Sequence, residues 1–259
     1  MIGICLLFSV SILTFFSIYN QTIPAKDTPP ANKGVLDLSS WDFRSKGLVS
    51  LDGQWEFYEG QLLTPADFRS GSRSDMTYIT VPGTWKGKDE VGGMSRKGYG
   101  TYRLKVVVAN MDDIYGIKLR NIRMSHLLFI NGKIEGASGA PAGSLEQHQP
   151  GNTPYSTYFH TDKREVEIII QVANYMYITG GIINSIQFGL HSDISMLSGI
   201  QLGTDIGAVI ILVILGIYHL NFYFLRMKEK AYLVSGLYLL TIMVGQLIYG
   251  ERFCFAFYR

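Results

Sequence analysis

The chain has 259 residues, of which 47% are hydrophobic and 17% charged, and its mean hydropathy is +0.15. This composition excludes a disordered chain and favours contact with a membrane. The formal net charge is +2, and residues 20–202 hold 18 basic and 18 acidic side chains, which is not the balance of a nucleic-acid-binding domain.

The chain begins with an apolar run. Residues 2–18 read IGICLLFSVSILTFFSI, an uncharged stretch with the length of a signal-peptide core or a short anchor. No Lys or Arg precedes it and no clear cleavage site follows, so cleavage stays open, and a buried N-terminal helix is the alternative. We predict a signal peptide or N-terminal anchor over 1–19 and a polar, proline-containing linker over 20–34.

Residues 35–200 are predicted to form an all-β jelly-roll sandwich, because short runs rich in β-branched and aromatic residues alternate with Gly, Pro, Asn and Asp turns. Along 102–108 the even-numbered residues are predicted to face a core, whereas Arg103, Lys105 and Val107 face the other side. An Asn131-Gly132 hairpin turn is also expected. The predicted strands are 53–58, 78–81, 100–108, 114–119, 126–130, 155–159, 165–173 and 182–189.

Two long uncharged runs follow this region. Ile206–Leu225 and residues 231–249 are each long enough to cross the hydrocarbon core of a bilayer, and the segment between them carries three cations. The positive-inside rule then places 226–230 in the cytoplasm and 20–202 outside the cell. We predict transmembrane helices over 203–225 and 231–250, with 251–259 as the start of an extracellular loop in a truncated chain.

Polar residues inside the two runs, His219, Asn221 and Gln246, are expected to pack against neighbouring helices, with a signalling or transport path as the alternative. The two cysteines, Cys5 and Cys254, lie in apolar segments and are expected to be inert thiols. No Cys-x-x-Cys or Cys/His spacing is present, so we predict no metal, no cofactor and no disulfide framework.

Five segments carry a resemblance. In order, LDGQWEFY (51–58), VPGTW (81–85), GYGTYRLKV (98–106), LLFINGKIEGASG (127–139) and EIIIQVANY (167–175) resemble the jelly-roll sugar-binding domain of the β-galactosidase and β-glucuronidase family. Together with the helices and GIYHLNFYFLRMKEKAYL (216–233), the arrangement more closely resembles the bacterial seven-transmembrane receptors with diverse intracellular signalling modules. The resemblance covers residues 35–250.

The chain departs from that receptor family in two respects. The family has seven helices and then a cytoplasmic output module, commonly a histidine kinase or a nucleotide cyclase, whereas two helices and no such motif occur here. No nucleophile-elbow motif is present either, and Glu56 is expected to face solvent. We therefore predict no catalytic residues, and any output module would lie beyond residue 259.

A sugar is usually held by aromatic faces together with amides or charges that bond its hydroxyls. Residues of these types lie on the predicted strands and loops, and Gly136–Thr153, with His148, is expected to form an irregular rim. The alternative, which the resemblance to the jelly roll implies, is that Trp55, Trp85 and Tyr102 are packing residues and that Asn131-Gly132 is a turn. The candidate ligand-binding residues are Trp85, Tyr99, Arg103, Asn131, Tyr155, Asn174 and Tyr175.

The predicted function is the sensory part of a receptor in the bacterial plasma membrane, with an extracellular domain that binds a carbohydrate or another small molecule. A homodimer or a downstream signalling protein is the expected protein partner, and nucleic acid is not expected. One alternative is a membrane-tethered carbohydrate-binding module without signalling, and another is the remnant of a disrupted receptor gene. Coding sequence beyond Arg259 would separate the receptor from these two.

Overall fold

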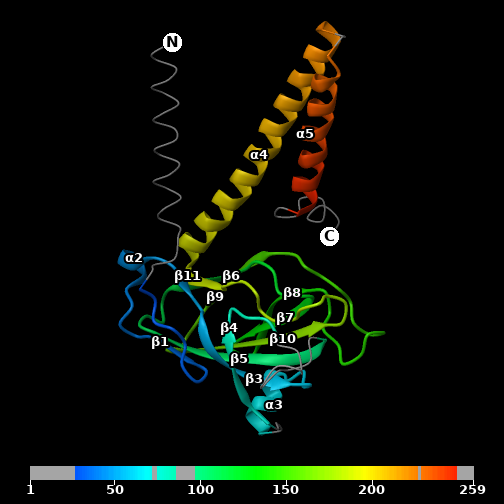
Figure 1. Ribbon diagram of the computed structural model, residues 1–259. Helices are drawn as coiled ribbons and strands as arrows, with labels where there is room; N and C mark the ends of the chain where they lie inside the picture. Colours follow the sequence, from blue (N-terminus) through cyan, green and yellow to red (C-terminus); the bar gives the residue numbers. More distant parts are fainter. Residues whose placement is uncertain (1–26, 72–74, 86–96, 227–228, 250–259) are drawn as a thin grey trace. The chain divides into compact units, whose positions relative to one another are not determined.

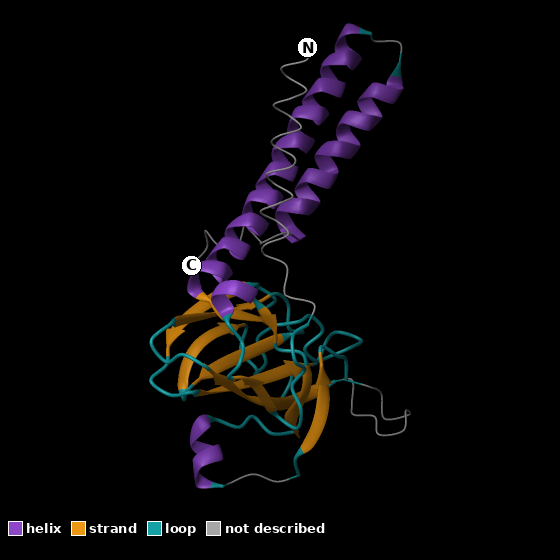
Figure 2. Ribbon diagram, turned by 90° about the vertical axis from the view of Figure 1, so that its left-hand side faces the viewer, coloured by secondary structure: helices purple, strands orange, loops and turns teal. Residues whose placement is uncertain are grey.

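The computed structural model describes residues 27–71, 75–85, 97–226 and 229–249, and these form a mostly β region followed by two long helices (Figures 1 and 2). A boundary between two compact units falls after Met196. The predictions of a signal peptide or anchor over 1–19 and of an extracellular loop over 251–259 lie outside the described residues.

The larger sheet, sheet A, has seven strands (Figure 1). All its neighbouring strands are antiparallel except β1, which pairs parallel with β5. Their order is β4 (Thr77–Val81), β3 (Gly53–Glu59), β5 (Gly98–Val108), β10 (Glu165–Asn174), β7 (Ser125–Ile130) and β8 (Lys133–Ser138), with β1 (Val35–Leu38) beside β5.

The smaller sheet, sheet B, has four strands, and two short helices complete the β region. Helix α2 (Phe43–Lys46) follows β1, and α3 (Pro65–Ser70) lies in the connection between β3 and β4 (Figure 1). Helix α3 begins with a proline that cannot donate a backbone hydrogen bond, which suits the first helical position. The order of sheet B is β2 (Val49–Ser50), β11 (Gln187–Leu190), β6 (Ile114–Leu119) and β9 (Tyr155–His160).

The two sheets pack face to face around one hydrophobic core, which makes this region a β-sandwich. The predicted alternation along β5 is confirmed, because the even-numbered residues from Tyr102 to Val108 are fully buried and the odd-numbered ones are partly exposed. Each sheet contributes packed aromatic rings to this core, with Tyr115 stacked on Phe188 in sheet B and Trp55 edge-on against Tyr102 in sheet A.

Seven of the eight predicted strands are confirmed within two residues at each end, and β6 has the predicted bounds. The last one is wrong at its start, because 182–189 is a strand only from Gln187, and Gly136–Ser138 belongs to β8 rather than to an irregular rim. The short elements β1, β2, α2 and α3 have too few residues to show a periodic pattern in the sequence.

Helix α4 runs from His191 to Leu225 and α5 from Lys230 to Tyr249. Helix α4 thus begins twelve residues before the predicted start at 203, because its first turns are too polar to read as part of an apolar run. Ile194 in these turns is fully buried and packs beside Gly116 of β6.

Helices α4 and α5 lie side by side in both views and pack through glycines (Figures 1 and 2). A Cβ at Gly216 would lie 2.8 Å from Leu240, and a Cβ at Gly236 would lie 2.9 Å from Leu220, so each helix offers a glycine notch to a leucine of the other. The side chain of Gln246 donates a hydrogen bond to Asp205 across the same pair, at 3.1 Å. The two helices therefore form a packed hairpin.

Both helices are long and apolar enough to cross a membrane, and 6% of the apolar window of each is buried, which is not the burial of a core helix. Gln246 meets the expectation of a contact between helices. The His219 ring also meets this expectation, since it lies 6.5 Å from the Tyr232 ring of α5. The side chains of His219 and Asn221 each bond a backbone carbonyl four residues earlier in their own helix. A polar side chain can satisfy itself in this way without a partner helix.

Candidate ligand-binding cleft

A cleft of about 740 Å³ opens at one end of the sandwich, where the turn from β7 to β8 meets the turn from β9 to β10. Asn131 and Gly132 both have positive φ, 48° and 87°, as a two-residue hairpin turn requires. The Asn131 side chain joins the two turns, because its Oδ1 accepts from the backbone N–H of Glu167 at 2.9 Å and its Nδ2 donates to Thr161 Oγ1 at 3.3 Å.

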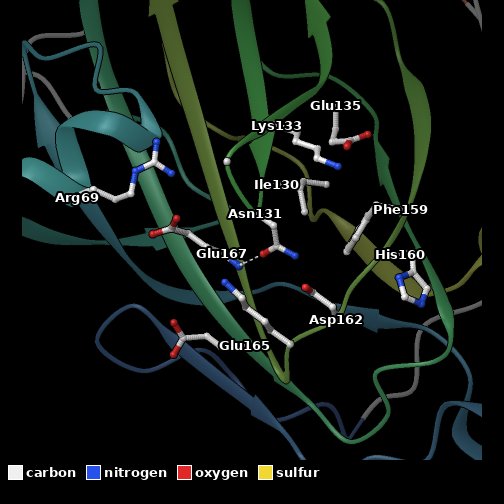
Figure 3. Close-up of a pocket in the computed structure, with 12 residues that line it drawn as sticks. Arg69, Ile130, Asn131, Lys133, Glu135, Phe159, His160, Asp162, Glu165 and Glu167 are labelled. Carbon is white, nitrogen blue, oxygen red and sulfur yellow. Dashed lines mark hydrogen bonds between the residues drawn. The ribbon is translucent and has the colours of Figure 1, made fainter.

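The wall of this cleft combines many polar groups with a small apolar surface (Figure 3). Ile130 and Phe159 are 2% and 7% exposed, and Phe159 packs against the core rings Tyr115 and Phe188. The cleft is lined by Arg69, Ile130, Asn131, Gly132, Lys133, Glu135, Phe159, His160, Asp162, Lys163, Glu165 and Glu167.

Two of the lining carboxylates pair with cations of strand β5. Glu165 pairs with Lys105 at 2.9 Å. Glu167 accepts from Arg103 Nε at 2.9 Å and from Nη2 at 2.6 Å. The Arg103 guanidinium also donates to Glu56 at 3.2 Å. Burial of Arg103 acts to lower its pKa, but the two carboxylates outweigh it and the pKa is raised.

Of the predicted ligand residues, Asn131 lies in the cleft and Arg103 lies behind it. Arg103 is occupied by two carboxylates, and its guanidinium also lies over the Phe68 ring at 4.6 Å. It therefore holds Glu167 in place and helps to fix the cleft wall. The sequence could not assign this role, because both carboxylates lie far from Arg103 along the chain.

Trp85, Tyr99, Asn174 and Tyr175 gather at the other end of β5 and β10, away from the cleft. Trp85 is 3% exposed and donates its indole N–H to Tyr102 Oη at 2.7 Å. Asn174 is fully buried, and its side chain bonds both the N–H and the carbonyl of Tyr177. Trp85 thus has the packing role that the alternative interpretation gave it, and Asn174 stabilises the turn after β10.

A pocket of about 100 Å³ does open beside Trp85 and Tyr99. Sites for small organic ligands usually occupy about 300–1,000 Å³, so this pocket is small for a sugar. Tyr175 donates to the carbonyl of Ala142 at 3.0 Å and packs edge-on against His148, which is 7% exposed. Burial raises the pKa of Tyr175 and lowers that of His148, as expected for side chains packed under the loop.

Tyr155 lies between the sheets with His126, outside the cleft. Its hydroxyl is 3.0 Å from His126 Nε2, and the two rings stack at 5.6 Å, with Gly136 leaving room for the tyrosine ring. His126 is 1% exposed, and this burial lowers its pKa to about 4. The seven predicted residues thus occupy three separate places in the sandwich.

The side chains of the cleft other than Asn131 are not among the predicted site residues, and they come from α3, β7, β8, β9, β10 and the turn between β9 and β10. The signal for them in the sequence is polar turn residues after two predicted strands, Lys133 after one and Asp162 and Lys163 after the other. Within the described ranges, no group of three or more His, Cys, Asp or Glu side chains could hold a metal ion.

No family model matches the sequence, and no curated protein matches it. Among solved structures, a GH2 β-galacturonidase from Eisenbergiella tayi bound to galacturonate is 15% identical over 55% of this chain and 24% of that chain, with a TM-score of 0.38. A β-glucuronidase from Ruminococcus gnavus is 12% identical over 55% of this chain and 28% of that one, with a TM-score of 0.40. This chain thus spans about a quarter of the length of these matched structures.

Proposed function

We propose that this chain is the sensory part of a bacterial membrane receptor, whose extracellular jelly-roll domain binds a carbohydrate in the cleft at the Asn131–Gly132 turn. The observation that carries the proposal is the cleft itself, which places hydrogen-bond donors and acceptors around an apolar floor. The proposed role is binding and not catalysis. The second candidate is a membrane-tethered carbohydrate-binding module that does not signal.

The chemistry of the cleft supports a sugar as the ligand. A sugar hydroxyl both donates and accepts, so it is best held where cations and carboxylates lie close together. Lys133 and Lys163 supply donors, and Glu135 and Asp162 supply acceptors. The floor of Ile130 and Phe159 can cover the apolar edge of a sugar ring.

The two helices support attachment to a membrane. Apart from the seam at Gly216 and Gly236, most of their large side chains are exposed, as in a hairpin that faces lipid. The positively charged segment that joins them favours a cytoplasmic position for this end of the hairpin.

Signalling requires that the ligand bind two conformations with different affinities. In the proposed mechanism, occupation of the cleft changes the population of two arrangements of the α4–α5 hairpin, one of which holds the hydrogen bond between Gln246 and Asp205. A tethered module needs no such change. A change in the conformation of the hairpin on glycan binding would therefore distinguish the receptor from the tethered module.

The direct test is a glycan-binding screen of the full chain in lipid nanodiscs, with empty nanodiscs as the control. The proposal predicts specific and saturable binding of at least one glycan. If a broad panel of plant, bacterial and host glycans gave no saturable binding, the proposed function would be wrong.

A second measurement separates the receptor from the tethered module. In a protein with Cys5→Ser and Cys254→Ser, cysteines introduced by Asp205→Cys and Gln246→Cys would be joined with a short thiol-specific crosslinker, with and without the bound glycan. The receptor predicts a crosslinking yield that changes with glycan. An unchanged yield at saturation would favour the module.

A further inference from the structure

Ion pairs to its surroundings engage two of the four carboxylates that line the cleft. Glu165 pairs with Lys105, and Glu167 shares Arg103 with Glu56, and none of these three partners lines the cleft. Glu135 has no ionic partner among the described residues and accepts one long hydrogen bond, from Thr157 at 3.5 Å. Two carboxylates, Glu135 and Asp162, are therefore left to act on a ligand.

Three cations face these two carboxylates, and in the part of the chain that the structure describes none of the three has an ionic partner. Arg69 lies in the last turn of α3 with a guanidinium nitrogen 3.7 Å from where a Cβ at Gly132 would be, so it reaches the turn from outside the sheet. Lys133 follows that turn, and Lys163 lies in the turn before β10. Among the described residues of the cleft, three cations without an ionic partner therefore face two carboxylates without one.

We propose, on the basis of the proposed function, that the cleft is selective for an acidic carbohydrate, and that the ligand carries one carboxylate on the sugar residue that the cleft recognises. Arg69 and Lys133 lie on opposite sides of the Asn131–Gly132 turn (Figure 3), and in this proposal the carboxylate binds against the turn, where both flexible side chains can turn toward it. Guanidinium and ammonium groups bind carboxylates through charge-assisted hydrogen bonds, which are stronger than neutral ones.

The same charges disfavour a polyanion. Glu135 and Asp162 lie in the same wall as the cations and would repel a second negative charge, whereas they can accept hydrogen bonds from sugar hydroxyls. A uronic acid combines one carboxylate with several hydroxyls, and so it matches this wall better than a sulfated or phosphorylated chain does.

The test uses pairs of ligands that differ only in the carboxylate. The full chain in nanodiscs would be titrated with the methyl glycosides of galacturonate and of glucuronate, and with those of galactose and glucose, in which a hydroxymethyl group replaces the carboxylate. We expect at least one acidic form to bind about tenfold or more tightly than its neutral form, and the preference to shrink as salt is raised.

The double variant Arg69→Gln/Lys133→Gln should lose this preference while still binding the neutral sugar. The matched control is Lys46→Gln/Arg120→Gln, which removes the same charge from two exposed cations outside the cleft and should keep the preference. Equal binding of both forms, or equal losses in the two double variants, would overturn the inference and leave carbohydrate binding intact. No binding of either form by any protein, together with a silent glycan screen, would overturn the proposed function as well.

Discussion

His126 is the buried residue whose ionisation matters most for the stability of the sandwich. Burial lowers its pKa to about 4, whereas a histidine in an unfolded chain has a pKa of about 6.5. Between these values the unfolded state binds the proton and the folded state does not. The free energy of unfolding is therefore highest above about pH 6.5 and falls as the pH drops toward 4.

We predict that the protonation of His126 lowers the free energy of unfolding of the wild-type sandwich by about 2 kcal/mol between pH 7 and pH 5. In His126→Gln most of this decrease should be absent. Glutamine stays neutral and can still bond the Tyr155 hydroxyl. Urea unfolding of the full chain at each pH, followed by tryptophan fluorescence, measures this free energy. Trp41, Trp55 and Trp85 all lie in the sandwich and report its unfolding. Equal pH dependence in both proteins would show that His126 does not carry the effect.

Trp85 is a packing residue, so its substitution should affect stability and not ligand affinity. Trp85→Phe removes the donor to the buried Tyr102 hydroxyl, and we expect the free energy of unfolding to fall by about 1–3 kcal/mol. The double variant Trp85→Phe/Tyr102→Phe should cost less than the sum of its single changes, because either single change already removes the hydrogen bond that the two side chains share. A tenfold loss of glycan affinity at unchanged stability would instead place Trp85 in the ligand site.

At the scale of elements, the α4–α5 hairpin depends on the glycine notches. Gly236→Ile would force the Leu220 side chain away and separate the helices, so the yield of the Asp205→Cys/Gln246→Cys crosslink should fall severalfold. Gly207→Ile is the control, since no atom lies within 4 Å of a Cβ there, although Gly207 is nearer the crosslinked pair. If both changes lower the yield alike, the notch is not what joins the helices.

Much of the secondary structure could be predicted because its signals are local. The alternation along β5 and the Asn131-Gly132 pair define a strand and a hairpin without reference to the rest of the chain. The two-residue strand β2 and the four-residue strand β1 have no such pattern, and they form because partner strands are already in place.

The cleft could not be predicted in the same way. It forms because β10 pairs antiparallel with β7, which brings the turn after Ile130 next to the turn before Glu165. That pairing joins residues more than thirty positions apart. Choosing residues by chemical type instead favoured aromatic side chains such as Trp85 and Tyr155, which the fold uses between the sheets.

At the scale of the whole molecule, the proposal sets a topology for the membrane. A reporter fused after Lys230 should behave as cytoplasmic, because the segment between the helices carries three cations. A reporter fused directly after Ser70, in place of the rest of the chain, should behave as exported. Finding the first reporter outside the cell would reverse the topology and place the cleft in the cytoplasm.

If the cleft at the Asn131–Gly132 turn is the ligand site, a bulky side chain placed in it should weaken glycan binding. Calorimetric titration of cleft variants with a glycan measures this affinity. His160 is an exposed lining residue, so His160→Trp adds a large ring to the cleft while leaving the core unchanged, and Met111→Trp adds the same ring at an exposed site elsewhere. We expect His160→Trp to weaken the binding of a glycan found in the screen by about tenfold or more, and we expect Met111→Trp to bind this glycan with wild-type affinity. Equal affinity in all three proteins would contradict the assignment of the ligand site to this cleft.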